Sequence, residues 1–219
     1  MRKIYFLGYL MLFVCLFTSC GKDDNFKYPA VQMEMLMANI TDSGEIDNIY
    51  LDNGEAYRVS INKQKPLYDF KGTQIRAIAF LEINKEEQEA IIHSIAPIPI
   101  IIPEKVGGVL DLPRDPVSVQ RSWVSGNFLN IELGIKSKNL NLHKLLFAEF
   151  VSVTNEGKLC FNIDFYHSVE DDVEAFTQRY FLSIPLSNYG SLSDGEAFQL
   201  KFSINTDKGL LDYIFNIIP

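Results

Sequence analysis

The sequence predicts an all-β protein in which a small barrel is followed by a β-sandwich. Most apolar segments are short and alternate with polar residues, which is the period of a half-buried strand. Turn-forming Gly, Asn, Asp and Pro separate these segments about every 8–12 residues in the second half, a spacing typical of β-sandwiches. Glycine, charge and proline concentrate in residues 104–108 and 113–116, which predicts a boundary between two modules.

Residues 1–19 have the layout of a secretory signal. The basic pair Arg2-Lys3 precedes an apolar run over residues 4–17, and small residues follow it. The run is shorter than the ~20 residues that a membrane-spanning helix needs. We therefore expect the signal to be cleaved before Cys20.

The end of this signal resembles a lipobox, because Phe17, Thr18 and Ser19 directly precede Cys20. A lipobox implies recognition by signal peptidase II and acylation of the Cys20 thiol, with residues 20–30 as a lipidated tether. Stable anchoring takes more than one acyl chain, and the multiply acylated cysteine of bacterial lipoproteins, which includes palmitate, meets that requirement. The alternative is an ordinary signal with a cysteine near its cleavage site by chance.

The residues after Cys20 predict a location. Lys22, Asp23 and Asp24 resemble the acidic export signal of some Gram-negative lipoproteins. This predicts a lipid-anchored protein of the outer membrane that faces the cell surface. The alternatives are a solvated linker and attachment to the periplasmic leaflet.

The expected mature chain is acidic and has a single unmodified thiol. Loss of residues 1–19 removes two positive charges, so the formal net charge of −8 becomes −10. An acidic protein is repelled by phosphate backbones, which disfavours nucleic acid as a partner. Cys15 leaves with the signal and Cys20 is acylated, so Cys160 has no disulfide partner. We expect Cys160 to be structural.

The first module is predicted from five strand-like segments, which are residues 34–40, 49–51, 55–61, 72–83 and 89–102. The turn at Asp52-Asn53-Gly54 predicts a hairpin, because Asn-Gly tolerates positive φ. The longest segment is apolar on both faces, which suits a small barrel; Ile75, Ala77, Ala79, Leu81 and Ile83 share one face, and Ile78 and Phe80 lie on the other. Pro97, Pro99 and Pro103 restrict the last segment to an edge or an extended arm.

The second module is predicted from seven segments, which are residues 117–123, 128–135, 143–154, 159–166, 176–185, 197–205 and 210–218. In two of them strict alternation assigns the faces. Leu129, Ile131, Leu133 and Ile135 are predicted to point inward, and Phe128, Asn130, Glu132 and Gly134 outward. Leu159, Phe161, Ile163 and Phe165 share one face, and Cys160 lies on the other with Asn162 and Asp164.

The sequence contains none of the familiar catalytic motifs. Gly-x-Ser-x-Gly, His-Glu-x-x-His and phosphate-binding glycine loops are absent, so we expect no catalytic residue, no metal ligand and no cofactor. The nearest group is His167 with Glu170, Asp171 and Asp172. It suggests a calcium site or a hydrolase, but the Asp-x-Asp-x-Asp-Gly spacing is missing and a solvated hairpin loop is favoured.

Three residues are candidate ligand contacts, namely Trp123, His167 and Asp172. Trp123 is the only tryptophan. A carbohydrate-stacking platform is one interpretation, and a packing residue of the sandwich is the other and the favoured one.

Several blocks together resemble the NigD-like lipoproteins. They are LDNGE at residues 51–55, KGTQIRAI at 71–78, DPVSV at 115–119, WVSGNFLNI at 123–131, HKLLF at 143–147, IDFYH at 163–167 with Asp172, and RYFLSIPL at 179–186. The resemblance implies an N-terminal OB-like β-barrel over residues 31–110 and an immunoglobulin-like β-sandwich over residues 111–219. That division agrees with the boundary expected from composition.

The resemblance also implies a function. We expect a non-enzymatic, membrane-anchored binding or interaction protein of the cell envelope, with an envelope protein, a toxin or a glycan as partner. The family takes its name from a bacteriocin locus, so the resemblance implies bacteriocin immunity as a narrower version of this role. The alternatives are a surface glycan-binding or peptide-binding accessory protein, a carboxylate-based hydrolase, and nucleic-acid binding by the OB-like module. The last would draw on Arg58, Lys63, Lys65, Lys71 and Arg76.

Overall fold

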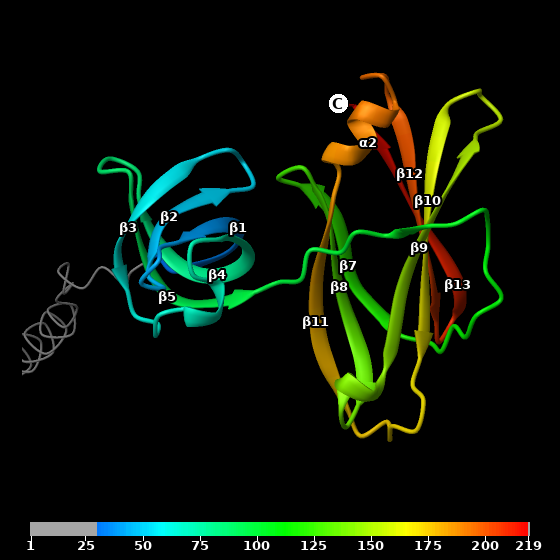
Figure 1. Cartoon of the computed structure of the whole chain (residues 1–219), viewed down its shortest axis with the longest axis horizontal. Helices are drawn as coiled ribbons and strands as arrows, with labels where there is room; N and C mark the ends of the chain where they lie inside the picture. Colours follow the sequence, from blue (N-terminus) through cyan, green and yellow to red (C-terminus); the bar gives the residue numbers. More distant parts are fainter. Residues whose placement is uncertain (1–29, 219) are drawn as a thin grey trace, which may run out of the picture. The chain divides into compact units, whose positions relative to one another are not determined.

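The computed structural model describes residues 30–218, except for the side chains of Asn188, Ser191 and Leu192, and it confirms the all-β prediction (Figure 1). The predicted signal, the acylated Cys20 and the acidic export signal lie outside the described residues. Residues from Val31 onward form one compact unit. Within the described part, no helix is both long and apolar enough to cross a membrane.

The first module is a closed five-stranded barrel. Its strands are β1 (Gln32–Ile40), β2 (Ile46–Leu51), β3 (Ala56–Asn62), β4 (Gln74–Asn84) and β5 (Glu89–Pro97), in the order β1-β2-β3-β5-β4. Neighbours are antiparallel except β3 and β5, which are parallel. A 3-10 turn, η2 (Tyr68–Phe70), connects β3 to β4. This closure leaves no open sheet edge, as expected of an OB-like barrel.

The barrel core follows the predicted alternation. Ile75, Ala77, Ala79 and Leu81 of β4 point inward and are buried. The two alanines leave room for larger side chains from the facing strands; these are Leu36, Ile40, Ile46, Ile49, Leu51, Tyr57 and Ile92. The opposite face of β4 contains Arg76, which is buried as well.

The chain then crosses to the second module along strand edges. β5 ends at Pro97, and residues 99–101 pair with Ser183 of the second module. The two-residue strand β6 (Glu104–Lys105) runs parallel to β9. Prolines suit such edge positions because they lack a backbone donor. The extended arm expected from the prolines is confirmed, but the strand expected over residues 89–102 is shorter than predicted.

The second module is a β-sandwich of two sheets. One sheet has the order β11-β8-β7, and the other β13-β12-β10-β9-β6. The strands are β7 (Ser118–Ser125), β8 (Phe128–Ser137), β9 (Lys144–Val153), β10 (Leu159–Ser168), β11 (Phe176–Pro185), β12 (Phe198–Thr206) and β13 (Gly209–Ile217). In Figure 1 the layer with β7, β8 and β11 lies beside the layer with β9, β10, β12 and β13.

The sandwich core is aromatic and aliphatic, as the alternation predicts. Leu129, Ile131, Leu133 and Ile135 of β8 are fully buried. They face Phe161, Ile163 and Phe165 of β10 in one hydrophobic cluster. The rings of Phe147 and Phe165 lie 4.8 Å apart, and those of Phe161 and Phe198 meet edge to face at 5.3 Å. Cys160 is buried and free, and burial raises the pKa of its thiol, as expected for a structural residue.

Two details differ from expectation. The short helix α2 (Ser187–Leu192) was not predicted; buried Tyr189 fixes it by donating a hydrogen bond to Glu149. Asn130 and Glu132 point to the outer face of the sheet but are buried rather than solvated. The predicted module boundary between residues 110 and 111 stays a prediction.

Candidate functional site

Arg76 is the centre of a polar network between the barrel and the outer face of the β7-β8-β11 sheet. Its side chain has an exposed fraction of 0 %. The guanidinium holds both carboxylate oxygens of Asp52, with 2.7 Å from Nη2 to Oδ2. It also donates to Asn130 Oδ1 at 3.1 Å and to Ser183 Oγ at 3.3 Å, and it lies 4.5 Å from the Phe128 ring. A bidentate pair of this kind fixes orientation as well as charge.

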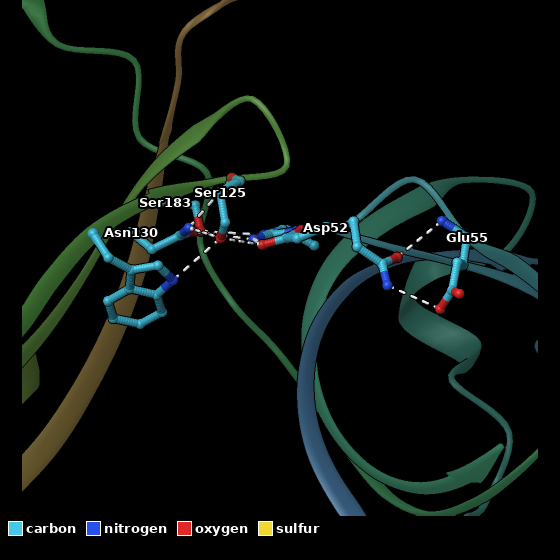
Figure 2. A network of polar contacts seen from close by, with 8 residues as sticks. Asp52, Glu55, Ser125, Asn130 and Ser183 are labelled. Atoms are coloured by element: carbon cyan, nitrogen blue, oxygen red, sulfur yellow. Dashed lines mark hydrogen bonds and ion pairs between the residues drawn. The ribbon is translucent and has the colours of Figure 1, made fainter. Parts of the chain in front are cut away.

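The remaining groups of this network satisfy one another. Ser125 donates its hydroxyl proton to Asp52 at 2.6 Å and accepts from Trp123 Nε1 at 3.1 Å. Ser183 donates to Asn130 Oδ1 at 2.7 Å. Figure 2 shows Asp52 directed toward Ser125, Asn130 and Ser183. Because Asp52, Arg76, Ser125, Asn130 and Ser183 are all hydrogen-bonded to one another across the junction, the network joins the two modules through fixed contacts.

Gly126 allows this close approach. Its φ is +56°, a conformation that other residues adopt at a cost. A Cβ at this position would lie 2.1 Å from Asp52 Oδ1. The turn between β7 and β8 therefore needs glycine both for its backbone and for contact with the Asp52 carboxylate.

A cavity of about 400 Å³ lies beside the network. Its walls come from β1, β4 and the β2–β3 turn of the barrel and from β7 and β11 of the sandwich. The lining residues are Met33, Glu34, Met35, Leu51, Asp52, Asn53, Ile78, Arg121, Trp123, Ser125 and Phe181. This volume is within the range of small-ligand sites, and the mixture of apolar walls with few polar groups is typical of them.

The sandwich wall of the cavity is stiffened by a buried carboxylate. Glu132 has an exposed fraction of 2 % and accepts from Arg121 Nε at 2.9 Å and from Arg179 Nε at 2.8 Å. Burial alone would raise the pKa of Glu132, but hydrogen bonds from Arg179 and Arg121 outweigh it and lower the pKa. Arg121 also lies over the Trp123 ring at 5.2 Å, so both residues are held in place.

The barrel wall contributes Glu34, which is partly buried. Among residues 30–218, no side chain forms an ion pair or a hydrogen bond with its carboxylate. Burial raises the pKa of Glu34, and the negative charges of Asp52 and Glu55 raise it further. Glu34 is therefore the polar group of the cavity with free binding capacity.

Trp123 belongs to this cavity. It is half-buried on the outer face of β7 and is not a member of the hydrophobic cluster in the sandwich core, so the favoured interpretation as a packing residue stays a prediction. Its indole donates to Ser125 and its ring lines the cavity. The interpretation as a binding platform remains open.

His167 and Asp172 lie in a different cluster. His143 Nε2 is 3.0 Å from Asp172 Oδ2, and His143 Nδ1 is 2.8 Å from His167 Nε2. His167 Nδ1 is 3.0 Å from the carbonyl oxygen of Asp115. Asp172 accepts a hydrogen bond from Lys138 N, just beyond the end of β8, whereas Trp123 pairs with Asn130 near the start of that strand. A strand rises ~3.3 Å per residue, so the two clusters lie about 26 Å apart along β8.

The acceptors around this cluster fix the direction of two imidazole protons. Asp172 and the Asp115 carbonyl can only accept, so His143 Nε2 donates to Asp172 and His167 Nδ1 donates to Asp115. The 2.8 Å contact between the two rings has room for at most one further proton. Backbone hydrogen bonds from Asn139 and other residues, with one from His143, lower the pKa of Asp172 to about 2, which keeps it ionised.

The rest of the predicted acidic group does not converge on this cluster. Glu170 pairs with Lys144 at 3.0 Å, and Asp171 is exposed. Asp172 uses one oxygen to accept from Lys138 N, Asn139 N and His143 Nε2. His143 and Asp172 side chains are 0 % and 4 % exposed. Asp172 and His167 are therefore held within the fold at the end of β8 and β10. Their role as ligand contacts stays a prediction.

The basic residues considered for a nucleic-acid groove do not form one. Arg76 is buried in the junction network, and Arg58 pairs with Glu89. Lys71 lies over the Tyr68 ring, and Lys63 contacts His93. Of these residues, Arg58 and Arg76 pair with carboxylates, those of Glu89 and Asp52.

Sequence reasoning missed most of the site. Asp52 was noted only as part of a turn, and Asn130 and Glu132 only as outward positions. The available signal was the outward row on β8, in which a polar and a charged residue alternate with an unbroken apolar row. In a protein with two modules, a row of outward polar residues can face the other module as readily as it can face solvent.

Comparison with known families gives one match. Residues 106–217 match the family described as the NigD-like C-terminal beta sandwich domain. This region contains β7 to β13, including Trp123, Ser125, Asn130 and Ser183. Among curated proteins none matches the chain.

Solved structures share the fold. A NigD-like immunity protein from Bacteroides caccae has a TM-score of 0.70 and 24% identity, covering 89% of this chain and all of that one. A protein from Parabacteroides distasonis, described as toxin-related, has a TM-score of 0.60 and 17% identity, over 85% and 93% of the two chains. A protein from Bacteroides fragilis, described as a lipoprotein, has a TM-score of 0.55 and 13% identity, over 85% and 97%.

Proposed function

Since the chain belongs to the NigD-like family, we propose that it is a non-enzymatic, lipid-anchored protein of the cell envelope that binds a protein toxin and protects the cell. The observation that carries this proposal is the cavity beside the Arg76 network. Its walls are stiffened by paired charges. Its lining combines apolar side chains with polar ones, and one of its carboxylates, Glu34, has no partner among the described residues. Such a site suits binding, since preorganised walls reduce the cost of association.

The family supports the immunity role. The structure from Bacteroides caccae, which has the same fold over most of this chain, is described as an immunity protein. An immunity protein has to hold its toxin rather than transform it. The charged groups of the cavity walls fit that task, because Asp52 is held by Arg76, and Arg121 is held by Glu132.

The location supports the same role. We propose that signal peptidase II cleaves before Cys20, that the cysteine is acylated, and that Lys22, Asp23 and Asp24 direct the protein to the outer face of the outer membrane. A surface position would let the protein meet a toxin before it enters the cell. The protein from Bacteroides fragilis with the same fold is described as a lipoprotein, which supports lipid anchoring.

The anchoring is tested by labelling cells with a palmitate analogue. The wild-type protein should incorporate the label and sediment with the outer membrane, and protease added to intact cells should degrade it. The Cys20→Ser variant should lose the label. Unlabelled wild-type protein would contradict lipidation, and protease resistance in intact cells would place it on the periplasmic leaflet.

The immunity role is tested by deleting the gene and exposing the strain to toxins made by itself and by close relatives. The deletion should sensitise the cells to at least one toxin, and a plasmid-borne wild-type copy should restore survival. A Cys20→Ser copy should restore little, because the protein would no longer be held at the envelope. Equal survival of deletion and parent strains across these toxins would refute the role.

Trp123 favours a second candidate, a surface accessory protein that binds glycans. An indole at the wall of a cavity is a common platform for sugar rings, and Asn53 and Glu34 offer polar contacts beside it. Screening the purified protein against envelope and dietary glycans tests this candidate. Binding that disappears in Trp123→Ala would favour it over toxin binding.

A further inference from the structure

The polar groups that line the cavity differ in their free capacity. Asp52 is bound by Arg76 and Ser125. Asn53 donates to Glu55, and Arg121 is bound to Glu132. Glu34 alone of the lining side chains that bear a charge has no such partner within residues 30–218. A ligand that enters the cavity therefore meets one carboxylate that can accept hydrogen bonds.

The charges around Glu34 determine whether a positively or a negatively charged ligand is favoured. Asp52 and Glu55 lie close enough for their negative charges to raise the pKa of Glu34, in addition to the effect of burial. Arg76 compensates Asp52, and Lys85 compensates Glu55 at 3.0 Å, but no such partner compensates Glu34 among the described residues. A cation bound here would satisfy a carboxylate that is partly removed from water.

The rest of the wall favours a cation on a long apolar stem. Met33 and Met35 line the barrel side, and Trp123 and Phe181 line the sandwich side. Methionine adapts to irregular apolar partners, and lysine and arginine lay their methylene stems along apolar surface while the charged end finds a polar group. Arg121 already covers one face of Trp123 and is bound to Glu132, so the ligand cation belongs at the barrel wall.

Building on the proposed function, we propose that the cavity receives one basic side chain, lysine or arginine, of the bound partner protein. Its charged group pairs with Glu34, and its stem packs along the apolar lining of the cavity beside Trp123. The bound residue would act as an anchor, since one side chain buried in a pocket at an interface supplies a large share of the binding energy.

This arrangement has a consequence for pH. The carboxylate has to be ionised to pair with a cation, and in the empty cavity its pKa is raised. Binding therefore releases a proton from part of the population, and affinity weakens as the pH falls toward that pKa. A purely apolar ligand would show no such dependence through Glu34.

The test uses three blocked peptides, acetyl-Gly-Arg-Gly-amide, its lysine counterpart and its citrulline counterpart, which keeps the shape of arginine without the charge. The readout is the indole N–H resonance of Trp123 in the purified protein; Trp123 is the only tryptophan, so the protein has one such signal. The arginine and lysine peptides should shift this signal in a saturable way. The citrulline peptide should bind at least about tenfold more weakly.

The matched variants are Glu34→Gln and Glu86→Gln. Both remove one barrel carboxylate, but Glu86 is exposed in the turn between β4 and β5. Glu34→Gln should weaken binding of the arginine peptide about tenfold or more and abolish its pH dependence, while Glu86→Gln should bind like the wild type. An unchanged Trp123 signal in free Glu34→Gln, apart from local shifts, confirms that the variant is folded.

Several results would overturn the inference. These are equal binding of citrulline and arginine peptides, unaltered binding by Glu34→Gln, no saturable shift with either basic peptide, or displacement of Trp123 signals only by a neutral sugar such as maltotriose. Survival assays separate this inference from the proposed function. Full protection by Glu34→Gln cells would refute the role of Glu34 and leave immunity intact. A Glu34-dependent peptide site in a protein whose deletion never alters survival would refute immunity alone.

Discussion

Two polar clusters of this protein contrast in composition and in surroundings. The junction cluster joins Asp52, Arg76, Asn130 and Ser183 and borders a cavity. The histidine cluster, which consists of His143, His167 and Asp172, lies at the far end of the sandwich and does not line that cavity. Both are buried and both are hydrogen-bonded throughout.

The difference shows that residue type is a weak guide to the place of binding. Histidine beside aspartate suggests chemistry, yet here all four imidazole nitrogens are in hydrogen-bond contact and one Asp172 oxygen accepts three hydrogen bonds, which fixes the ends of β8 and β10. The junction uses arginine, asparagine and serine, which suggest nothing by type. It borders the cavity because the barrel and the sandwich meet there, and the side chains of the two facing surfaces leave part of the space between them unfilled.

The largest expected effect comes from breaking the junction pair. Arg76→Met leaves the partly buried Asp52 carboxylate without its cation, which typically costs about 3–5 kcal/mol of unfolding free energy. Urea unfolding followed by Trp123 fluorescence measures the loss directly, because the indole contacts the same network through Ser125. Adding Asp52→Leu to Arg76→Met should recover part of the loss, since the double variant has no uncompensated charge.

The control for this variant is Arg58→Met. Arg58 also forms an ion pair in the barrel, with Glu89, but its side chain is 69% exposed. Exposed pairs contribute about 0–1 kcal/mol, so the control should lose little stability. Similar losses in both variants would mean that the junction is not a stabilising contact between the modules.

A smaller effect is expected at Gly126. Gly126→Ala combines backbone strain at positive φ with a Cβ that displaces the Asp52 carboxylate. The control is Gly157→Ala in the turn between β9 and β10. Gly157 has a φ of +81°, so the variant has the same kind of backbone strain, but no atom lies within 4 Å of its Cβ. The control should cost about 1–2 kcal/mol, and Gly126→Ala about 1–3 kcal/mol more, because hydrogen bonds to Asp52 are lost as well. Equal costs in urea unfolding would show that Asp52 moves aside freely.

The fold was largely predictable because its strands obey a simple period. The inward rows of β4, β8 and β10 follow from alternation, and the turn at Asp52-Asn53-Gly54 follows from residues that tolerate positive φ. The helix α2 escaped prediction because six residues are too few to show a helical period, and its stability depends on the distant contact between Tyr189 and Glu149.

The site was not predictable in the same way. Arg76 and Asn130 are 54 residues apart in the chain, and Arg76 and Ser183 are 107 apart. No local pattern marks which surface rows of two modules will face each other. Trp123 was identified as a candidate contact from its residue type. Whether its ring joins a core or lines a cavity depends on how the barrel and the sandwich pack against each other.

The histidine cluster predicts a dependence of stability on pH. Burial lowers the pKa of His167 from its ordinary value of 6.5, and the positive charge near His143 lowers it further, against a hydrogen bond to the Asp115 carbonyl that raises it. The geometry gives the same direction, because a second added proton would place two N–H groups against each other across the 2.8 Å contact. Below pH 6.5 the unfolded chain therefore binds more protons than the folded one, and stability falls with pH.

The smallest expected effect is a change in how steeply the free energy of unfolding varies with pH when the contact between His143 and His167 is broken. Urea unfolding of the wild type between pH 7.5 and 5 should show stability falling below about pH 6.5, and His167→Gln should fall less steeply. His93→Gln is the matched control, because His93 is a barrel histidine that is partly exposed beside Glu82 and Lys63. Charges that face the cluster, namely Asp115, Asp172 and Glu174, are unchanged in both variants, so they cancel in the comparison. The opposite result would contradict this prediction: His93→Gln would remove the dependence of the unfolding free energy on pH, and His167→Gln would keep it. The group that binds protons on unfolding would then be in the barrel and not in the histidine cluster.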